Sequence, residues 1–182
     1  MTDPLGLAEG MVRVIPHQPM WKTLYEAEAA RLQVEFAQRG LEVRLEHTGS
    51  TAVPGLAAKP IVDILGGHTS DVPRARIITA LVDADYVHRG EQGIAGRDFF
   101  RRGMPRQYHL HLTTVSSAFW RDHRAFRDFL KAHPDTARMY AELKYQLAER
   151  FPFDRPAYID GKSAFVHEIL TQAARRSPRG EA

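Results

Sequence analysis

Apolar and charged residues alternate over positions 41–47, and this period of two predicts a β-strand with one buried face. A second strand is predicted over 60–66, where the apolar run is interrupted by one carboxylate, Asp63. Gly66 and Gly67 are expected to end this strand. Between the two strands lies a turn rich in small residues, and the remaining segments are placed relative to it.

Helical and strand patterns continue on both sides of this unit. The expected elements are helices over 19–39 and 73–84, a short strand at 86–88, and a hairpin of strands 97–102 and 107–115. A helix that lies between two strands of one sheet is a crossover connection. The sheet is therefore predicted to be mixed, with parallel and antiparallel neighbours.

The chain from residue 116 onward has a helical pattern. One apolar stripe ends before Pro134, a second helix begins at Asp135, and a third begins near Ala157. The predicted fold class is α/β (α+β), a mixed β-sheet flanked by helices and followed by a C-terminal helical bundle.

Length and composition narrow the class of protein. The 182 residues suit one domain, expected over 14–172, with poorly ordered tails at 1–13 and 175–182. The absence of cysteine excludes disulfides, thiolate metal sites and cysteine nucleophiles. No apolar run is long enough to span a membrane, and the first residues lack the features of a signal peptide. We therefore expect a cytoplasmic protein with no membrane partner.

The formal net charge is +3, and the densest positive group comprises Arg97, Arg101, Arg102 and Arg106. This group is suited to attract a polyphosphate. Aromatic residues are not interleaved with it as they are in proteins that bind single-stranded nucleic acid, so a nucleic-acid partner is not expected. The sequence leaves the oligomeric state open.

The turn between the first two strands carries the main candidate site. A carboxylate inside an apolar strand costs free energy unless it is paired or lines a site, which singles out Asp63. Nucleotidyltransferases hold a triphosphate with a glycine-serine turn after one strand and an aspartate on the next. Here Gly49 permits close backbone approach, while Ser50 and Thr51 offer donors to phosphate oxygens. Lys59 adds a positive charge, and Asp63 would be catalytic by holding a divalent metal ion. The alternative is a tight turn with a structural ion pair between Asp63 and Lys59 or an arginine.

The strand predicted over 107–115 offers two further candidate ligands. His109 and His111 lie two residues apart, so both imidazoles project from the same face. This arrangement is typical of a metal or phosphate site. The alternative is that both histidines hydrogen-bond a ligand or water without any metal.

Several motifs together resemble the signature of the GrpB family. The longest is the run 47–64, and the others are 15–21, 109–112, 126–134 and 140–144. The resemblance covers nearly the whole chain and implies a branch of the nucleotidyltransferase superfamily, which also occurs fused to dephospho-CoA kinases. The family pattern places lysines at Lys144 and Lys162, which adds both residues to the phosphate-binding candidates.

The sequence departs from the nucleotidyltransferase pattern in the residues that would bind the metal ion. Active members present two carboxylates two residues apart on one strand, whereas here Asp63 is followed by Leu65. Glu46 restores a second carboxylate if its side chain points inward. Imidazole ligands at His109 and His111 favour a transition metal over Mg²⁺. The metal set predicted is therefore Asp63, His109, His111 and Glu46, around a single divalent ion.

These observations lead to a first hypothesis and an alternative. The first is a nucleotidyltransferase-like enzyme that binds a nucleoside triphosphate at Gly49 and Ser50, uses a divalent metal ion, and acts on an unknown acceptor. The alternative is a module that binds a nucleotide or a CoA-like ligand without catalysing transfer. Metal-dependent consumption of the nucleotide separates the two.

Overall fold

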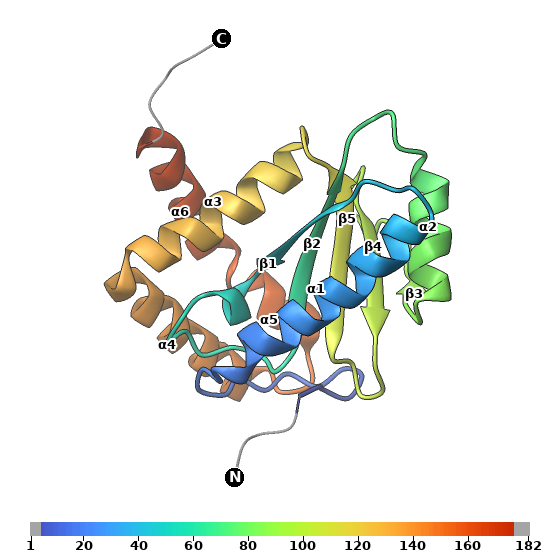
Figure 1. Cartoon of the computed structure of the whole chain (residues 1–182). Coiled ribbons are helices and arrows are strands. Elements are labelled where there is room, and N and C mark those ends of the chain that lie inside the picture. The colour runs from blue at the N-terminus through green and yellow to red at the C-terminus, as the bar shows by residue number, and fades with distance from the viewer. Residues whose placement is uncertain (1–4, 177–182) are drawn as a thin grey trace.

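The computed structural model describes residues 5–176, which form a sheet with helices on both faces (Figure 1). The strands are β1 (Arg44–Thr48), β2 (Val62–His68), β3 (Val87–His88), β4 (Asp98–Arg102) and β5 (Tyr108–Thr114). The helices are α1 (Met20–Gln38), the short 3-10 helix η1 (Ser50–Ala52), α2 (Arg74–Asp83), α3 (Ala118–Ala132), α4 (Pro134–Arg150), α5 (Arg155–Asp160) and α6 (Ser163–Arg176). The predicted strands and the first two predicted helices are confirmed to within a few residues.

The five strands form one mixed sheet in the order β1-β2-β5-β4-β3. β2 and β5 are parallel, and the other neighbouring pairs are antiparallel. The connection from β2 passes through α2 and returns by the β4–β5 hairpin, which places β5 directly beside β2. As a result Asp63 of β2 lies opposite His109 of β5, as the sequence predicted.

Different helices cover the two faces of the sheet. Trp21, Leu32 and Phe36 of α1 belong to one buried core together with Ile64 of β2 and Leu110 of β5. In Figure 1 α1 crosses in front of the sheet, whereas α3, α4 and α6 gather to its left. A second core joins these three helices to the loop after η1. This arrangement leaves the face that carries Asp63 beneath the C-terminal helices.

Gly67 explains why α3 can approach the sheet so closely. A Cβ atom on Gly67 would lie 2.5 Å from the ring of Trp120 of α3, so a side chain here would displace that helix. The expectation that Gly66 and Gly67 end the strand is wrong, because β2 continues through both to His68. Gly67 therefore allows α3 to pack closely on β2, and the strand does not turn there.

Two further expectations are corrected by packing. Residues 5–13 were expected to form part of a poorly ordered tail, yet Leu7 and Val12 are buried, and the Leu7 N–H donates to the Arg106 carbonyl. The single helix expected from Ala157 is two helices, α5 and α6, because the chain breaks at Gly161. The remaining predicted tail residues, 1–4 and 177–182, lie outside the described residues, and residues 175 and 176 belong to α6.

Candidate functional site

The turn after β1 and the carboxylate of β2 form one site. Thr48 pairs with Asp63 at the end of the β1–β2 ladder, and Gly49 follows with φ +69° and ψ −170°, a conformation that essentially only glycine adopts. A Cβ atom on Gly49 would lie 2.6 Å from Asp63 Oδ2. The backbone of the turn therefore reaches the carboxylate in a way that a larger residue would prevent.

Asp63 is paired with the two histidines of β5. His109 Nδ1 lies 3.3 Å from Asp63 Oδ1, and His111 Nε2 lies 3.8 Å from the same oxygen. Burial alone would raise the pKa of Asp63, but the contacts with both histidines outweigh it and hold that pKa well below its ordinary value. Asp63 is therefore an anion at neutral pH. The alternative of a structural ion pair with Lys59 or an arginine is not what the described residues show, since the histidines occupy that position.

His109 contributes a neutral imidazole. Burial lowers its pKa to about 4, although the neighbouring Asp63 carboxylate opposes this shift. At neutral pH the ring therefore carries one proton, which is suited to Nδ1 because that nitrogen faces the carboxylate. Nε2 of His109 and Nδ1 of His111 are buried and have no hydrogen-bond partner among the described residues.

The predicted metal ligands are only partly brought together. Asp63, His109 and His111 converge, with both imidazoles against the same carboxylate oxygen. Within residues 5–176, no group of three or more histidine, cysteine, aspartate or glutamate side chains is arranged to hold a metal ion. The residues present do not fit a metal site built from this chain alone.

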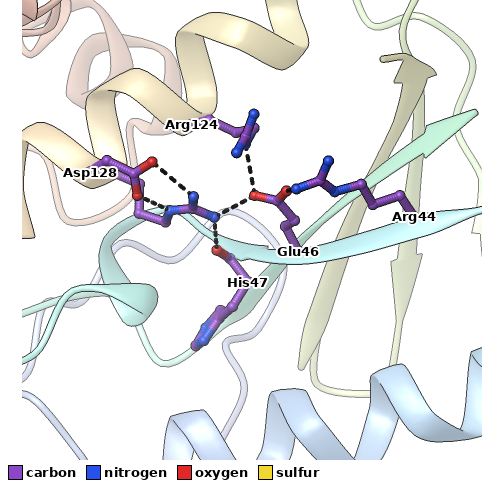
Figure 2. Close-up of polar contacts among 6 residues, drawn as sticks. Arg44, Glu46, His47, Arg124 and Asp128 are labelled. Atoms are coloured by element: carbon purple, nitrogen blue, oxygen red, sulfur yellow. Dashed lines mark hydrogen bonds and ion pairs between the residues drawn. The ribbon is translucent and has the colours of Figure 1, made fainter.

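Glu46 is the predicted ligand that the structure places elsewhere. It lies on the same face of the sheet as Asp63, but its carboxylate accepts from Arg124 Nε at 3.0 Å and from Arg127 Nη1 at 2.8 Å (Figure 2). Arg44 Nη2 lies 2.5 Å from its other oxygen. These three arginines hold the pKa of Glu46 below its ordinary value even though burial opposes the shift. The structure thus places the predicted ligand Glu46 among arginines, where its charge links α3 to β1.

Replacing Glu46 by glutamine should therefore lower stability and leave ligand binding unchanged. The variant leaves Arg127, whose side chain is 10% exposed, with a weaker partner. The expected loss in the free energy of unfolding is about 1.5–3 kcal/mol, the size of a hydrogen bond to a charged group. Denaturant unfolding measures this loss, with Glu42→Gln as the control because Glu42 is exposed on the same segment. A Glu46→Gln protein as stable as Glu42→Gln would contradict the anchoring role.

Above the turn lies a cavity of about 410 Å³ that gathers the predicted phosphate-binding residues. It is lined by Gly49, Ser50, Thr51, Lys59, Asp63, Lys144 and Lys162, among others. The turn lines it together with Tyr140 and Lys144 of α4 and Val166 and Leu170 of α6. All the residues predicted to bind phosphate thus share one cavity with Asp63.

The three lysines of this cavity are held by rings and a carbonyl rather than by carboxylates. Lys144 is 2% exposed and donates to the Ala57 carbonyl. Lys59 Nζ and Lys162 Nζ lie 5.3 Å and 4.6 Å from the centre of the Tyr158 ring. Among the described ion pairs none involves these three lysines within 4.0 Å of a carboxylate. Their charge is therefore available to a ligand.

Burial lowers the pKa of all three lysines. It lowers the pKa of Lys59 to about 7 and that of Lys162 to about 8, and it takes the pKa of Lys144 well below its ordinary value. Repulsion between the lysines adds to this effect at Lys59 and Lys144. An anion in the cavity would reverse these shifts by stabilising the protonated forms.

Much of the remaining cavity lining is apolar and was not predicted as part of a site. The residues concerned are Ile94, Phe119, Phe126, Tyr140, Val166 and Leu170, and the carboxylate of Asp122 lines the cavity with them. Sequence reasoning assigned the aromatic residues of α3 and α4 to helix stripes that pack into a core. His123 was assigned to the same stripe, but it also lines the cavity, where its ring stacks on Phe119 with centroids 3.8 Å apart. A helix stripe does not distinguish a core from the wall of a cavity.

The sheet, the glycine-serine turn and the aspartate on the next strand define a nucleotidyltransferase-like fold. A crystal structure of the Cid1 poly(U) polymerase, in its MgGTP-bound form, matches with a TM-score of 0.54 and 14% identity, over 75% of this chain and 45% of that one. This likeness establishes the shared fold. More particularly, the chain belongs to the GrpB family, whose model matches residues 11–172.

Two relatives support this family membership. A UPF0157 protein of Pseudomonas aeruginosa is 41% identical over 178 residues, which covers 92% of this chain and 70% of the relative. The crystal structure of the conserved protein GrpB from Enterococcus faecalis is 33% identical, with a TM-score of 0.78, over 90% of this chain and 98% of that one. No helix of the described residues is long and apolar enough to cross a membrane.

Proposed function

We propose that this protein binds a nucleoside triphosphate in the cavity above Gly49 and transfers its nucleotidyl group to an acceptor. The observation that carries the proposal is the contact between the glycine turn and Asp63 beneath a cavity that holds three lysines. The nucleotidyltransferase-like fold supports it, since the Cid1 polymerase is described with MgGTP bound.

The turn supplies the first part of the phosphate site. Gly49 brings the backbone close to the bound group, and donors clustered at a glycine turn favour anions. The Ser50 hydroxyl faces the cavity and has no hydrogen-bond partner among the described residues, so it is available to a phosphate oxygen. We assign the triphosphate to this turn for these reasons.

The lysines supply the charge that a triphosphate requires. Lys59, Lys144 and Lys162 line the same cavity as the turn, so phosphates bound there have donors from the turn and from the lysines within one cavity. The apolar wall at Phe126, Val166 and Leu170 suits the base and ribose, whose faces are largely apolar. The cavity thus offers one region to each half of a nucleotide.

Transfer from such a nucleotide would follow the usual chemistry of phosphoryl groups. A hydroxyl oxygen of the acceptor attacks the α-phosphorus and releases its proton to solvent. The new P–O bond forms as the bond from that phosphorus to the bridging oxygen breaks, and pyrophosphate leaves. The lysines neutralise the charge that develops on the leaving group. Because the residues of this chain do not complete a metal site, these lysines are the groups to which we assign that role.

A non-catalytic binding module is the second candidate. It is favoured by Leu65, which stands where active nucleotidyltransferases carry their second carboxylate, and by Glu46, which is held by three arginines. The two candidates differ in whether the nucleotide is consumed. ATP incubated with a high concentration of the protein should release pyrophosphate, and Asp63→Asn should abolish the release. Calorimetric binding of ATP without any pyrophosphate would favour the module.

The Ser50→Ala variant tests where the phosphates lie. Loss of one hydrogen bond of about 0.5–1.5 kcal/mol should weaken the binding of a non-hydrolysable ATP analogue about 2- to 10-fold. Calorimetry measures the affinity, and Ser70→Ala is the matched control because Ser70 is exposed in a turn away from the cavity. Equal affinities of wild type and Ser50→Ala would argue that the phosphates bind elsewhere.

A further inference from the structure

A second group of cations lies beside Asp63, outside the cavity that holds the lysines. It consists of Arg97, Arg101 and Arg155, called here the arginine cluster. We propose that this cluster binds a phosphate group of the acceptor substrate. That the bound molecule is the acceptor rests on the proposed function, whereas the anion site itself follows from the cluster alone.

The sheet register places the cluster next to the reacting centre. Arg101 of β4 pairs with His109 of β5, and His109 pairs with Asp63 of β2, so the three side chains form a row on one face. Neighbouring strands are about 4.8 Å apart, which puts Arg101 about two strand spacings from Asp63. An anion held by Arg101 is therefore within reach of a group bound at the glycine turn.

The Phe99 ring links the arginines to the histidines. The Arg97 and Arg101 guanidinium carbons lie 5.2 Å and 5.4 Å from the centre of this ring. The same ring lies 5.0 Å from the His109 ring and 5.1 Å from the His111 ring, centre to centre. Burial lowers the pKa of Arg97, and repulsion from Arg155, at the start of α5, adds to this shift; burial and repulsion from Arg101 lower the pKa of Arg155 in the same way. The cluster thus consists of Arg97 just before β4, Arg101 of β4 and Arg155 of α5.

The charges of the cluster are buried and under-compensated. Arg97 is 7% exposed and Arg101 is 9% exposed. The Nε atoms of Arg97, Arg101 and Arg155 are buried and have no hydrogen-bond partner among the described residues. Arg97 Nη2 donates to the carbonyls of Glu91 and Gln92, and Arg101 Nη1 donates to the Glu9 carboxylate, which is the one carboxylate that the cluster contacts among the described ion pairs. Buried positive charge in excess of its anionic partners is costly, so the free Nε donors are suited to an anion.

The carboxylate that the cluster does contact comes from a mostly exposed side chain. Glu9 approaches Arg101 Nη1 at 3.0 Å, although the Glu9 side chain is 72% exposed. Arg106 fixes the chain segment before Glu9 by donating to the carbonyls of Leu7 and Ala8. Glu9 therefore occupies a position that a ligand anion can take over without opening the core.

The residue type indicates which anion is bound. Each guanidinium group presents paired N–H donors that match the spacing of phosphate oxygens. Several guanidinium groups together suit the double negative charge of a phosphate group. The lysines already serve the triphosphate of the donor nucleotide. A phosphorylated acceptor would accordingly place its phosphate on the arginine cluster and its nucleophile near Asp63. Arg102 belongs to the same positive stretch of sequence but plays no part here, because it binds Glu28 on the other face of the sheet.

The test is calorimetric titration of the full chain with inorganic phosphate, alone and after saturation with a non-hydrolysable ATP analogue. Arg155→Gln should weaken phosphate binding about 10- to 100-fold, the effect of removing a hydrogen bond to a charged group. The Arg155 side chain has no hydrogen bond among the described residues, so this change spares folding contacts there. Arg138→Gln is the control, because the Arg138 side chain is 75% exposed and pairs with Asp135.

Glu9→Gln should act in the opposite direction. Removing the competing carboxylate should strengthen phosphate binding about 2- to 5-fold, the scale of an exposed ion pair. A cluster that merely anchors the N-terminal segment would show no such gain. Undiminished phosphate binding by Arg155→Gln, or its loss on saturation with the analogue, would overturn the proposal. If the analogue itself does not bind but phosphate still depends on Arg155, the proposed function fails and the anion site stands.

Discussion

Replacement of Gly49 by alanine should abolish nucleotide binding. The backbone at Gly49 adopts φ +69° and ψ −170°, a region that costs a residue with a side chain about 3 kcal/mol at the upper end of backbone strain. The new Cβ atom would also lie 2.6 Å from Asp63 Oδ2, well inside contact distance. The chain has to relieve both by moving the turn away from the carboxylate.

The expected loss of affinity follows from this movement. A ligand that needs the native turn must supply the strain energy again, so an ATP analogue should bind about 100-fold more weakly or not at all. Calorimetry gives the affinity, and circular dichroism with thermal unfolding shows whether the fold survives. A variant that unfolds cannot report on binding, so the comparison is made at a temperature where both proteins are folded.

Gly55 provides a matched control for the strain alone. It also has positive φ, +76°, but a Cβ atom there meets nothing within 4 Å. Gly55→Ala should cost about 1–2 kcal/mol of stability and leave the affinity for the analogue unchanged. If Gly49→Ala binds the analogue as tightly as Gly55→Ala does, the phosphates do not lie against the turn.

Much of the fold could be predicted because local patterns specify it. The alternation of apolar and charged residues predicted β1, and the apolar run around Asp63 predicted β2. The glycine-rich turn between them predicted that the two strands are joined by a short connection. The contact between Gly49 and Asp63 also followed from sequence, since strands joined by a short connection lie side by side. The crossover predicted a mixed sheet, and the strand of the two histidines was expected beside the Asp63 strand; the observed pairing of β5 with β2 sets His109 opposite Asp63.

The partners of buried charges could not be predicted in the same way. Glu46 shares a strand face with Asp63, and the period of two alone allows it to reach the site. The decisive partners, Arg124 and Arg127, come from a helix about eighty residues later, and no local pattern fixes how that helix lies across the sheet. The tail before residue 14 was misjudged for the same reason, because Leu7 is buried only by contacts with distant residues.

Affinity for the nucleotide should fall steeply as pH rises from 7 to 9. Burial lowers the pKa of Lys59 to about 7 and that of Lys162 to about 8, so both lose their protons across this interval in the free protein. A triphosphate binds the protonated lysines, so binding above these values requires proton uptake. The ligand itself changes little, because the second pKa of a phosphate is about 6.

Stability without ligand should change in the opposite direction. In the folded protein these lysines have pKa values below the ordinary 10.5, so the unfolded chain binds more protons between pH 7 and about 10. The free energy of unfolding therefore gains a contribution as pH rises through this window and loses it as pH falls. An affinity that falls while stability rises separates the buried lysines from general alkaline denaturation.

Calorimetric titration of an ATP analogue at pH 7, 8 and 9 measures the first trend. With two lysines each contributing up to tenfold per pH unit above its pKa, the affinity should fall about 100-fold or more over the interval. Lys162→Arg keeps its charge throughout and should flatten the profile by about one order of magnitude, whereas Lys22→Arg, an exposed control, should not. An affinity that stays constant from pH 7 to 9 would contradict binding of the phosphates by lysines whose pKa values are lowered, because such lysines lose their charge across this range.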